Sequence, residues 1–416
     1  MRPFPLALAM VLTAGLVLGA CSRNKAAQAG QESAEAAWVA YCEQLKQAGL
    51  EVLDEADPSL EIDRAEGLTY LADQVASATR AVLDAADPGE PLLTLGSQKL
   101  GKWGLDSADA KYVGAHSRGD GRYRLHGKLG SAHFVAIQLY RDEPRYEAYA
   151  SLSGDDLHPA PDGSFELIVS PQRPSRGVPW LALDPKATNL LVREYFYDWQ
   201  TEKPSTLWLE RLDPVAPAAP LRLASAEVRL QQIAQLFRAR APMWLPRMKK
   251  TRMLFTNRLV APRVEKGGQG LADNAYGAGW FSLAPDEALL IELEEPKAYA
   301  WSFQLGNLWW ESIDYLSHSA SLNGHQAVRS RDGRYRLVIS LEDPGVPNWL
   351  DPAGHSEGMV LYRYQRARTT PAPKATLVKI AELGKLLPVG TPQVSAEARR
   401  AALRLRKEHA ARRWAP

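Results

Sequence analysis

Apolar residues at near-helical spacing predict a pair of helices between residue 35 and about residue 86. The apolar positions are Trp38, Tyr41, Leu45, Leu50, Leu68, Leu71, Val75 and Ala78. Such spacing gathers apolar side chains on one face of a helix. Asp57-Pro58 separates the two helices and Asp87-Pro88-Gly89 ends the second, because proline and glycine interrupt helical hydrogen bonding.

From residue 91 the pattern changes to short apolar alternations separated by Asp-Gly and Gly-Pro pairs, which is typical of β-strands. The clearest candidate strands are 123–125, 134–140, 165–169 and 190–196. A proline- and alanine-rich linker covers 213–220, and helical periodicity returns over 228–237. A second strand-rich block runs from about 280 to 364. Residues 377–387 and 395–412 are predicted helices, the latter capped by Ser395.

The two strand-rich blocks repeat one order of motifs: Asp-Gly, an alternating run, Gly-Val-Pro, Trp and Arg. These motifs lie at Asp162, Trp180 and Arg193 in the first block and at Asp332, Trp349 and Arg363 in the second. The Asp-to-Trp separations are 18 and 17 residues, and the Trp-to-Arg separations are 13 and 14. The agreement predicts a duplicated unit. In each copy we expect an Asp-Gly hairpin turn, a Trp against the core and an Arg on the next strand.

The first residues carry a targeting pattern. Arg2 precedes an apolar run from Leu6 to Leu18, which is shorter than the roughly 20 apolar residues of a membrane-spanning helix. The sequence Leu18-Gly19-Ala20-Cys21 resembles the lipobox of bacterial lipoproteins. The resemblance implies that Cys21 carries lipid such as palmitate and attaches the chain to the cell envelope. Ser22, where retained lipoproteins have aspartate, implies the outer membrane, facing the periplasm.

Composition adds three constraints. The 50 basic and 48 acidic residues nearly balance, so we expect no nucleic-acid partner. Cys42 is the one cysteine besides Cys21, so it lacks an internal disulfide partner and is predicted to be a buried, inert thiol. The 12 tryptophans are available either for core packing or for stacking on flat ligands such as sugars.

The second block also resembles a known family. Its segments 301–307, 314–315, 321–323 and 343–350 are similar to DUF1214, a domain of unknown function. The resemblance covers about residues 270–365 and is weaker over 95–200, where Trp180 lacks the asparagine that precedes Trp349. It implies a β-sandwich of jelly-roll type and no particular chemistry.

These observations predict an α+β protein with two related antiparallel β-sandwich units, jelly-roll-like, and with N-terminal, connecting and C-terminal helices. The expected segments are a signal peptide (1–20), a flexible tether (21–34), an N-terminal helical region (35–90), a first, degenerate sandwich (91–213), a linker and helix (214–262), a second sandwich (263–370) and C-terminal helices (371–416).

Six residues are candidate ligand contacts: Arg193, Trp309, Asn323, His325, Trp349 and Arg363. Tryptophan can stack on sugars, and arginine can bind acidic groups through two hydrogen bonds. The alternative for the tryptophans is packing between two sheets. The alternative for the arginines is an internal ion pair, with Asp198 and Asp314 as expected partners. Because Trp309 and Trp310 are adjacent on an expected strand, we expect one of the two to be exposed.

Asp155 and Asp156, next to His158, form a loop carboxylate pair that could bind a cation or serve as acid and base, and Asp314 is a further candidate acid or base. The alternative is a solvated turn. His318, His325 and His355 are a possible set of metal ligands, but no tight spacing supports that set, and we expect neither metal nor cofactor. The chain also lacks a nucleophile elbow in a strand-turn-helix context, a phosphate-binding glycine loop and a dinucleotide fingerprint.

Three functions remain open. The absence of catalytic motifs favours a non-catalytic binding or scaffold protein of the envelope, recognising a glycan or another polar ligand. The second hypothesis is a carbohydrate-active hydrolase or lyase that uses the carboxylates above, which requires two of them across an open cleft. The third is a structural partner of another envelope protein, which requires an exposed apolar patch.

Overall fold

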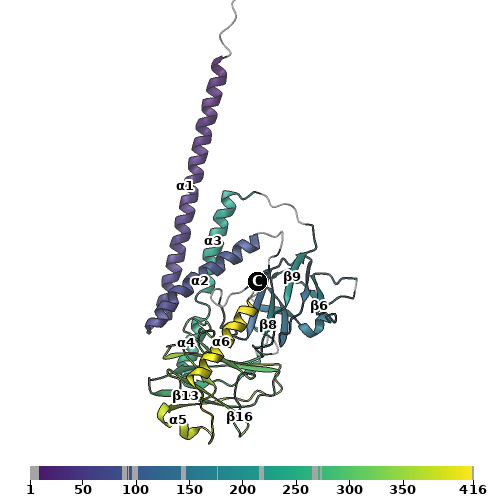
Figure 1. Cartoon of the computed structure of the whole chain (residues 1–416). Helices are drawn as coiled ribbons and strands as arrows, with labels where there is room; N and C mark the ends of the chain where they lie inside the picture. Colours follow the sequence, from purple (N-terminus) through teal and green to yellow (C-terminus); the bar gives the residue numbers. More distant parts are fainter. Residues whose placement is uncertain are drawn as a thin grey trace, which may run out of the picture.

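The structure is a computed structural model that describes residues 9–86, 91, 93–95, 102–141, 147–175, 177–214, 220–264, 270–271 and 274–414, with side chains from residue 30 onwards. It consists of two β-sandwiches that are packed together and flanked by helices (Figure 1). This arrangement confirms the predicted α+β class.

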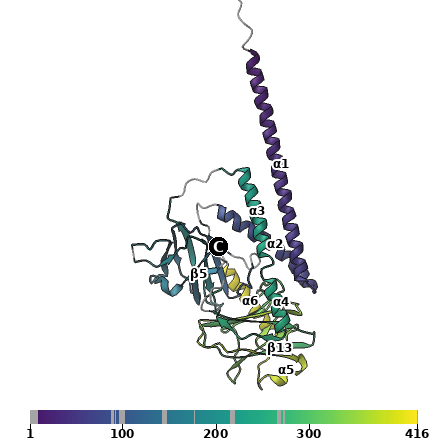
Figure 2. The same cartoon turned by 180° about the vertical axis from the view of Figure 1, so that it is seen from behind.

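The N-terminal helical pair is present as predicted. Helix α1 spans Ala9–Ala56 and helix α2 spans Glu61–Ala86, so the break falls at Asp57-Pro58. Helix α1 is continuous through residues 21–34, where we expected a flexible tether; the alanine-rich segment there has high helix propensity. The helix extends far beyond the rest of the molecule (Figures 1 and 2). Within the described residues, no helix combines the length and apolarity needed to cross a membrane.

The first sandwich is formed by two sheets. One sheet has the order β1-β2-β8-β4-β5 and the other β7-β6-β3-β9. The strands are β1 (Thr94–Leu95), β2 (Ala110–His116), β3 (Tyr123–Lys128), β4 (Phe134–Arg141), β5 (Glu147–Ser153), β6 (Ser164–Ser170), β7 (Trp180–Ala182), β8 (Ala187–Tyr195) and β9 (Thr206–Arg211), with a 3₁₀ turn at Gly154–Leu157.

The second sandwich has the same topology. Its sheets have the orders β10-β12-β18-β14-β15 and β17-β16-β13-β19. The strands are β10 (Arg258–Leu259), β11 (Arg263–Val264), β12 (Asn274–Ser282), β13 (Glu287–Glu294), β14 (Ala300–Gly306), β15 (Ser321–Asn323), β16 (Arg334–Ser340), β17 (Trp349–Leu350), β18 (Glu357–Gln365) and β19 (Lys374–Lys379). Strands β2 to β9 thus correspond one by one to β12 to β19, as the sequence repeat predicts.

The repeated motifs have repeated roles. Gly163 and Gly333 share a φ angle of 83°, in turns that lead into β6 and β16. The prediction that these turns close hairpins was wrong. Strand β6 pairs with β3 and β7, and strand β16 pairs with β13 and β17, so neither strand pairs with the one directly before it in the chain. Trp180 Nε1 donates to the carbonyl of Ser170 (3.1 Å), and Trp349 Nε1 donates to that of Ser340 (3.0 Å).

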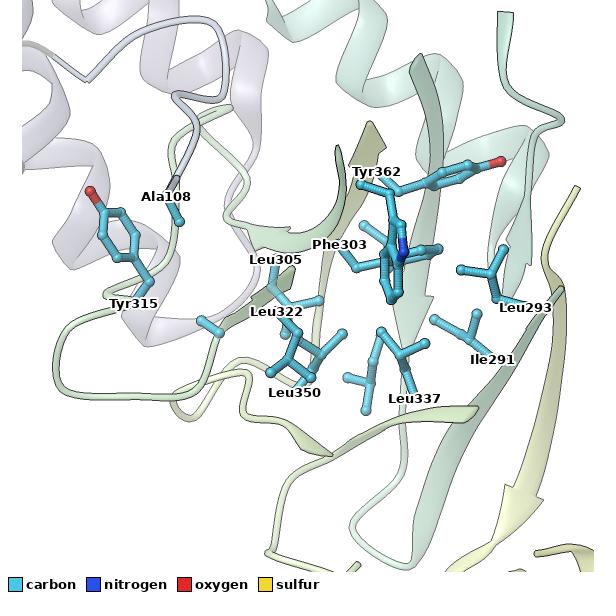
Figure 3. Close-up of a cluster of buried hydrophobic side chains, with 14 of the residues drawn as sticks. Ala108, Ile291, Leu293, Phe303, Leu305, Tyr315, Leu322, Leu337, Leu350 and Tyr362 are labelled. Atoms are coloured by element: carbon cyan, nitrogen blue, oxygen red, sulfur yellow. The ribbon is translucent and has the colours of Figure 1, made fainter. Parts of the chain in front are cut away.

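The core of the second sandwich lies between its two sheets. Leu293, Ile291 and Leu337 point into it from one sheet, and Phe303 and Tyr362 from the other (Figure 3). The rings of Phe303 and Tyr362 stack with centroids 4.8 Å apart. All five side chains are buried, so this core contributes through the hydrophobic effect.

The remaining helices cover the sheets. They are α3 (Leu223–Arg240), α4 (Leu245–Phe255), α5 (Ile380–Leu386) and α6 (Ala396–Arg413). Ser395 caps α6 by accepting from the Ala398 amide (3.2 Å), as predicted. The helix predicted over 377–387 was wrong at its start: residues up to Lys379 form β19, which pairs along β13 and contributes edge-strand hydrogen bonds that the local pattern does not reveal.

Candidate functional site

A cavity of about 410 Å³ lies between the second sandwich and helix α6. Its walls come from residues 198–200 of the first sandwich, the segments around β15 and β17, and α6. Leu322, Val328, Leu403 and Leu405 give it apolar surface. It is therefore built from three parts of the chain that are distant in sequence.

Two predicted ligand contacts, His325 and Trp349, line this cavity. Trp349 is half-buried and lies beneath the guanidinium of Arg399, 5.4 Å from the ring centroid. His325 is exposed, and its Nε2 lies 3.6 Å from Asp198 Oδ1. Asn323 is buried behind His325: its Oδ1 accepts from the His325 amide (3.1 Å), so it positions the turn. The cavity thus combines aromatic, basic and acidic groups.

The floor of the cavity is held by a buried charged cluster on α6. Arg406 donates to the carbonyls of Tyr315 and Ser321, and its guanidinium lies 5.0 Å from the ring centroid of Trp199. Arg413 lies 4.7 Å from the same ring centroid and donates to the Ala108 carbonyl (2.6 Å). Burial lowers the pKa of Arg406 to about 10, while Asp109 acts in the opposite direction.

Asp109 is the acidic member of this cluster. Its Oδ1 accepts from Asn323 Nδ2 (2.7 Å) and Trp199 Nε1 (3.0 Å). Burial raises its pKa, while Asn323 and the neighbouring Arg413 and Arg406 lower it. Asp109 directly precedes β2 of the first sandwich, Asn323 belongs to the second and both arginines lie on α6, so this cluster fastens the three parts together.

His409 is neutral in this cluster for a geometric reason. Its Nε2 accepts from Arg413 Nε (2.8 Å), and its ring stacks on Trp199 (centroids 5.2 Å apart). A second ring proton would face the guanidinium. Burial, with Arg413 adding to it, lowers the pKa of His409 from 6.5 to about 3.

We therefore predict that acid weakens the fold through His409. The unfolded histidine gains a proton as the pH falls below about 6.5 and the folded one does not, so stability is lost from pH 6.5 towards pH 3. When the pH is lowered from 6.5 to 5, the unfolding free energy should fall in both proteins, but the fall should be smaller in His409→Gln by about 1–2 kcal/mol. Urea titrations at both pH values measure this difference, and parallel losses in the two proteins would contradict it.

Arg193 and Arg363 occupy equivalent positions between the two sandwiches. Arg193 pairs across strands with Ala136, and Arg363 pairs with Ser302. Arg193 donates to Tyr140 Oη (2.7 Å), whereas Arg363 donates to Gln304 Oε1 (3.3 Å) and to the Leu105 carbonyl (2.5 Å). Neither arginine lines the cavity.

The predicted acidic partners of these arginines were wrong. Asp198 lies beside His325, and Asp314 accepts from the amides of Leu316 and Ser317. The described partners of Arg363 are instead polar groups at the interface between the sandwiches, Gln304 and the Leu105 carbonyl.

Two glutamines show that this interface is reciprocal. Gln138 Nε2 of the first sandwich donates to the Gly270 carbonyl (3.2 Å), and Gln304 Nε2 of the second donates to the Asp106 carbonyl (2.6 Å). Gly270 and Asp106 each precede the first long strand of their own sandwich, β12 and β2. Each unit therefore binds the lead-in segment of the other.

Trp309 and Trp310 are both buried, so the expectation that one would be exposed was wrong. The residues lie in a turn after β14 rather than on a strand, and helices cover them. Trp309 Nε1 donates to the Asp63 carbonyl on α2 (2.8 Å). Trp310 stacks on Trp244, with centroids 5.7 Å apart.

The candidate acid and base residues lie apart from the cavity. Asp155 and Asp156 are exposed in the 3₁₀ turn after β5, where Asp156 accepts from the Ser153 amide (3.1 Å) and Asp155 pairs with Arg366 (3.2 Å). Among the described residues, none of Asp155, Asp156 and Asp314 lines the cavity. The prediction that Cys42 is buried was wrong, because it lies on the solvent-facing side of α1.

The three histidines that were weighed as metal ligands have different neighbours. His318 Nδ1 lies 2.8 Å from Asp351, and His325 lies beside Asp198. His355 instead meets Asp63 and Glu66 of α2, and one ligand atom from each of these three residues lies within 4.8 Å of the others. Burial raises the pKa of Asp63 to about 6, an effect that His355 opposes.

Sequence analysis missed this cluster because Asp63 and Glu66 are polar residues on the buried face of an amphipathic helix. The one available signal was Gly67, a glycine inside a helix, which lets α2 approach Trp309: a Cβ there would lie 2.3 Å from Trp309 Cζ2. An interior glycine usually marks such close packing.

The fold is that of an α+β protein with two stacked β-sandwiches. Comparison with known proteins identifies the family. The model of a family described as a protein of unknown function, DUF1214, matches residues 106–197, which contain β2 to β8. The solved structure of an uncharacterised protein from Burkholderia cenocepacia is 30% identical, with a TM-score of 0.77, and the match covers 83% of this chain and 97% of that one. The chain belongs to the DUF1214 family.

Other comparisons add little. A solved structure from Vibrio parahaemolyticus is 12% identical with a TM-score of 0.44, and the match covers 75% of this chain and 100% of that one; the likeness is too low to support an argument. No curated protein matches the chain. The family model also corrects one expectation: it matches the first unit, whereas the sequence resemblance was placed mainly on the second.

Proposed function

We propose that this is a non-catalytic binding protein of the bacterial cell envelope, and that its ligand occupies the cavity between the second sandwich and α6. The cavity is the observation that carries the proposal. Its volume of about 410 Å³ suits a small ligand, and its mixture of apolar walls with a few polar groups is typical of ligand sites.

The chemistry of the cavity favours a ligand with an apolar face and polar substituents, such as a sugar. Trp349 and Leu405 offer apolar contact. Asp198, Asp351 and His325 offer hydrogen bonds to hydroxyl groups. Arg399 is paired with Asp343 (3.0 Å) and adds polar surface beside Trp349. A glycan fragment is thus the first class to test.

The proposed location rests on Cys21 and helix α1. A lipid on Cys21 would hold the protein at the outer membrane, facing the periplasm. Ser33 Oγ donates to Glu227 of α3 (2.5 Å), so α1 is attached to the body from that residue. Twelve helical residues at about 1.5 Å each would place the lipid roughly 18 Å from this contact.

The binding proposal is tested by thermal-shift measurements on the purified chain with envelope glycans and sugar acids. We expect at least one compound to raise the melting temperature of the wild type and to lose that effect in Trp349→Ala. The matched control is Trp180→Ala, which removes the equivalent tryptophan, with the same hydrogen bond, outside the cavity. A shift that survives in Trp349→Ala, or no shift with any compound, would count against the proposal.

The anchor is tested separately by cell fractionation and mass spectrometry. The wild type should be recovered from membranes with acyl chains on Cys21, and Cys21→Ser should lack them. An unmodified Cys21 in the membrane-derived protein would refute the lipoprotein assignment without affecting the cavity.

A further inference from the structure

A second site lies where helix α2 meets the second sandwich. Asp63, Glu66, Gly67 and Tyr70 fall at i, i+3, i+4 and i+7 and form the face of α2 that is turned to the sandwich. His355 reaches this face from the turn before β18. Asp63 and His355 have exposed fractions of 2% and 1%, whereas the side chain of Glu66 retains 28% and lies at the rim.

The orientation of His355 is that of a metal ligand. Its Nδ1 lies 2.7 Å from the Pro352 carbonyl, which can only accept, so Nδ1 carries a proton. In the neutral ring, the lone pair is then on Nε2, which lies 3.0 Å from Glu66 Oε2. A lone pair facing a carboxylate oxygen requires a proton or a cation beside both. Metal-binding histidines are commonly held in this way, through a carbonyl on the other ring nitrogen.

Asp63 gives an independent indication. Within the described residues, its carboxylate receives no hydrogen bond, although the residue is almost fully buried; only its backbone carbonyl does, from Trp309. The lone pairs of its two carboxylate oxygens are therefore available to a cation. This carboxylate lies within 4.8 Å of the ligand atoms of Glu66 and His355. One cation between the three groups would satisfy all of them.

The charges of the three residues, and the hydrogen bond that holds the Glu66 carboxylate, fit a divalent ion. The two carboxylates balance two positive charges when His355 is neutral. Nearby Arg252 and Glu357 neutralise each other at 2.6 Å. Asn307 Nδ2 donates to Glu66 Oε2 (3.0 Å) and orients that carboxylate.

From this geometry we propose that Asp63, Glu66 and His355 bind a divalent transition-metal ion, with Zn²⁺ as the best match. An imidazole nitrogen with two carboxylates suits zinc, whereas magnesium and calcium prefer oxygen ligands alone. The ion would fasten α2 to the second sandwich, because two ligands come from the helix and one from the sandwich.

The test is calorimetric titration of the EDTA-treated full chain, without a histidine tag, with Zn²⁺ and separately with Mg²⁺. The background carries Cys21→Ser and Cys42→Ser so that no thiol competes. We expect one Zn²⁺ per chain, no comparable Mg²⁺ binding, and a higher melting temperature with Zn²⁺. Glu66→Gln, at the exposed rim, and His355→Gln should each weaken Zn²⁺ binding by about 10-fold or more.

The matched control is His318→Gln, because His318 also pairs with a carboxylate, Asp351, but has no third ligand among the residues that the structure describes. It should leave Zn²⁺ binding unchanged. If His355→Gln does not fold, the Glu66→Gln titration and the visible spectrum of the Co²⁺-loaded wild type, with its displacement by Zn²⁺, still decide the question. Absence of Zn²⁺ binding, or binding that persists in Glu66→Gln, would overturn the proposal.

Discussion

Asp109→Ala is expected to lower the unfolding free energy by about 3–5 kcal/mol, because it removes the buried acceptor of two hydrogen bonds together with the negative charge that acts on Arg406 and Arg413. The two donors are Asn323 Nδ2 and Trp199 Nε1, and both arginine charges come from α6. Loss of the carboxylate therefore loosens both sandwiches and α6 together. Equilibrium unfolding in urea measures the effect.

Asp109→Asn separates charge from shape. The amide keeps an acceptor for Trp199 but not the negative charge, so this variant should recover less than half of the lost stability. Asp120→Ala is the control, since that aspartate is exposed and paired with Arg118, and the expected cost is below about 1 kcal/mol. An Asp109→Asn variant as stable as the wild type would show that charge does not hold the cluster.

Trp309→Ala is expected to cost about 3–5 kcal/mol, the usual range for a large buried aromatic side chain. The residue is 1% exposed, stacks on Tyr70 (centroids 5.3 Å apart) and donates to the Asp63 carbonyl. Its loss should release α2 from the sandwich. Urea unfolding gives the magnitude, and faster hydrogen exchange in residues 61–86 would locate it.

The close approach of Gly67 gives this prediction an internal check. Gly67→Ala places a Cβ 2.3 Å from Trp309 Cζ2, so it should destabilise the wild type by about 1–3 kcal/mol but not the Trp309→Ala variant. Gly49→Ala on α1 is the control: its Cβ would meet Leu71 Cδ1 at an ordinary 3.5 Å, and alanine favours the helix. Equal effects of Gly67→Ala in both backgrounds would contradict the packing described here.

The sequence predicted the sandwiches well because their strands alternate cleanly and their motifs repeat. Leu167 and Val169 point into the first core, and Leu337 and Ile339 into the second, at matching positions after each Asp-Gly turn. Register and sheet order follow from such patterns only once partner strands are known. For that reason the local pattern predicts a helix over residues 377–379, which form the end of the edge strand β19.

The helical faces were predicted less well. Trp38 and Leu68 match the helical spacing but are 57% and 65% exposed, whereas Asp63 is buried. Burial on α2 is decided by Trp309 and His355, which lie about 240 to 290 residues away along the chain. Local periodicity carries no information about such partners.

The candidate site was predicted in part for the same reason. His325 and Trp349 lie near each other in sequence and share the cavity, whereas Asp198, Arg399 and Leu405 complete it from other segments. Arg193 and Arg363 were correctly placed on equivalent strands. Their position between the sandwiches depends on how the two units pack, which the repeat does not specify.

The most direct test of the account is to fill the cavity and measure binding. Ala402→Trp introduces a large side chain into the lining from an exposed position on α6, one helical turn before Arg406. With a glycan that raises the melting temperature of the wild type, calorimetry should give a Kd at least about 10-fold weaker for Ala402→Trp and an unchanged Kd for Trp180→Ala; a 10-fold change corresponds to about 1.4 kcal/mol. Unchanged binding in the filled variant would contradict the proposal that this cavity is the ligand site.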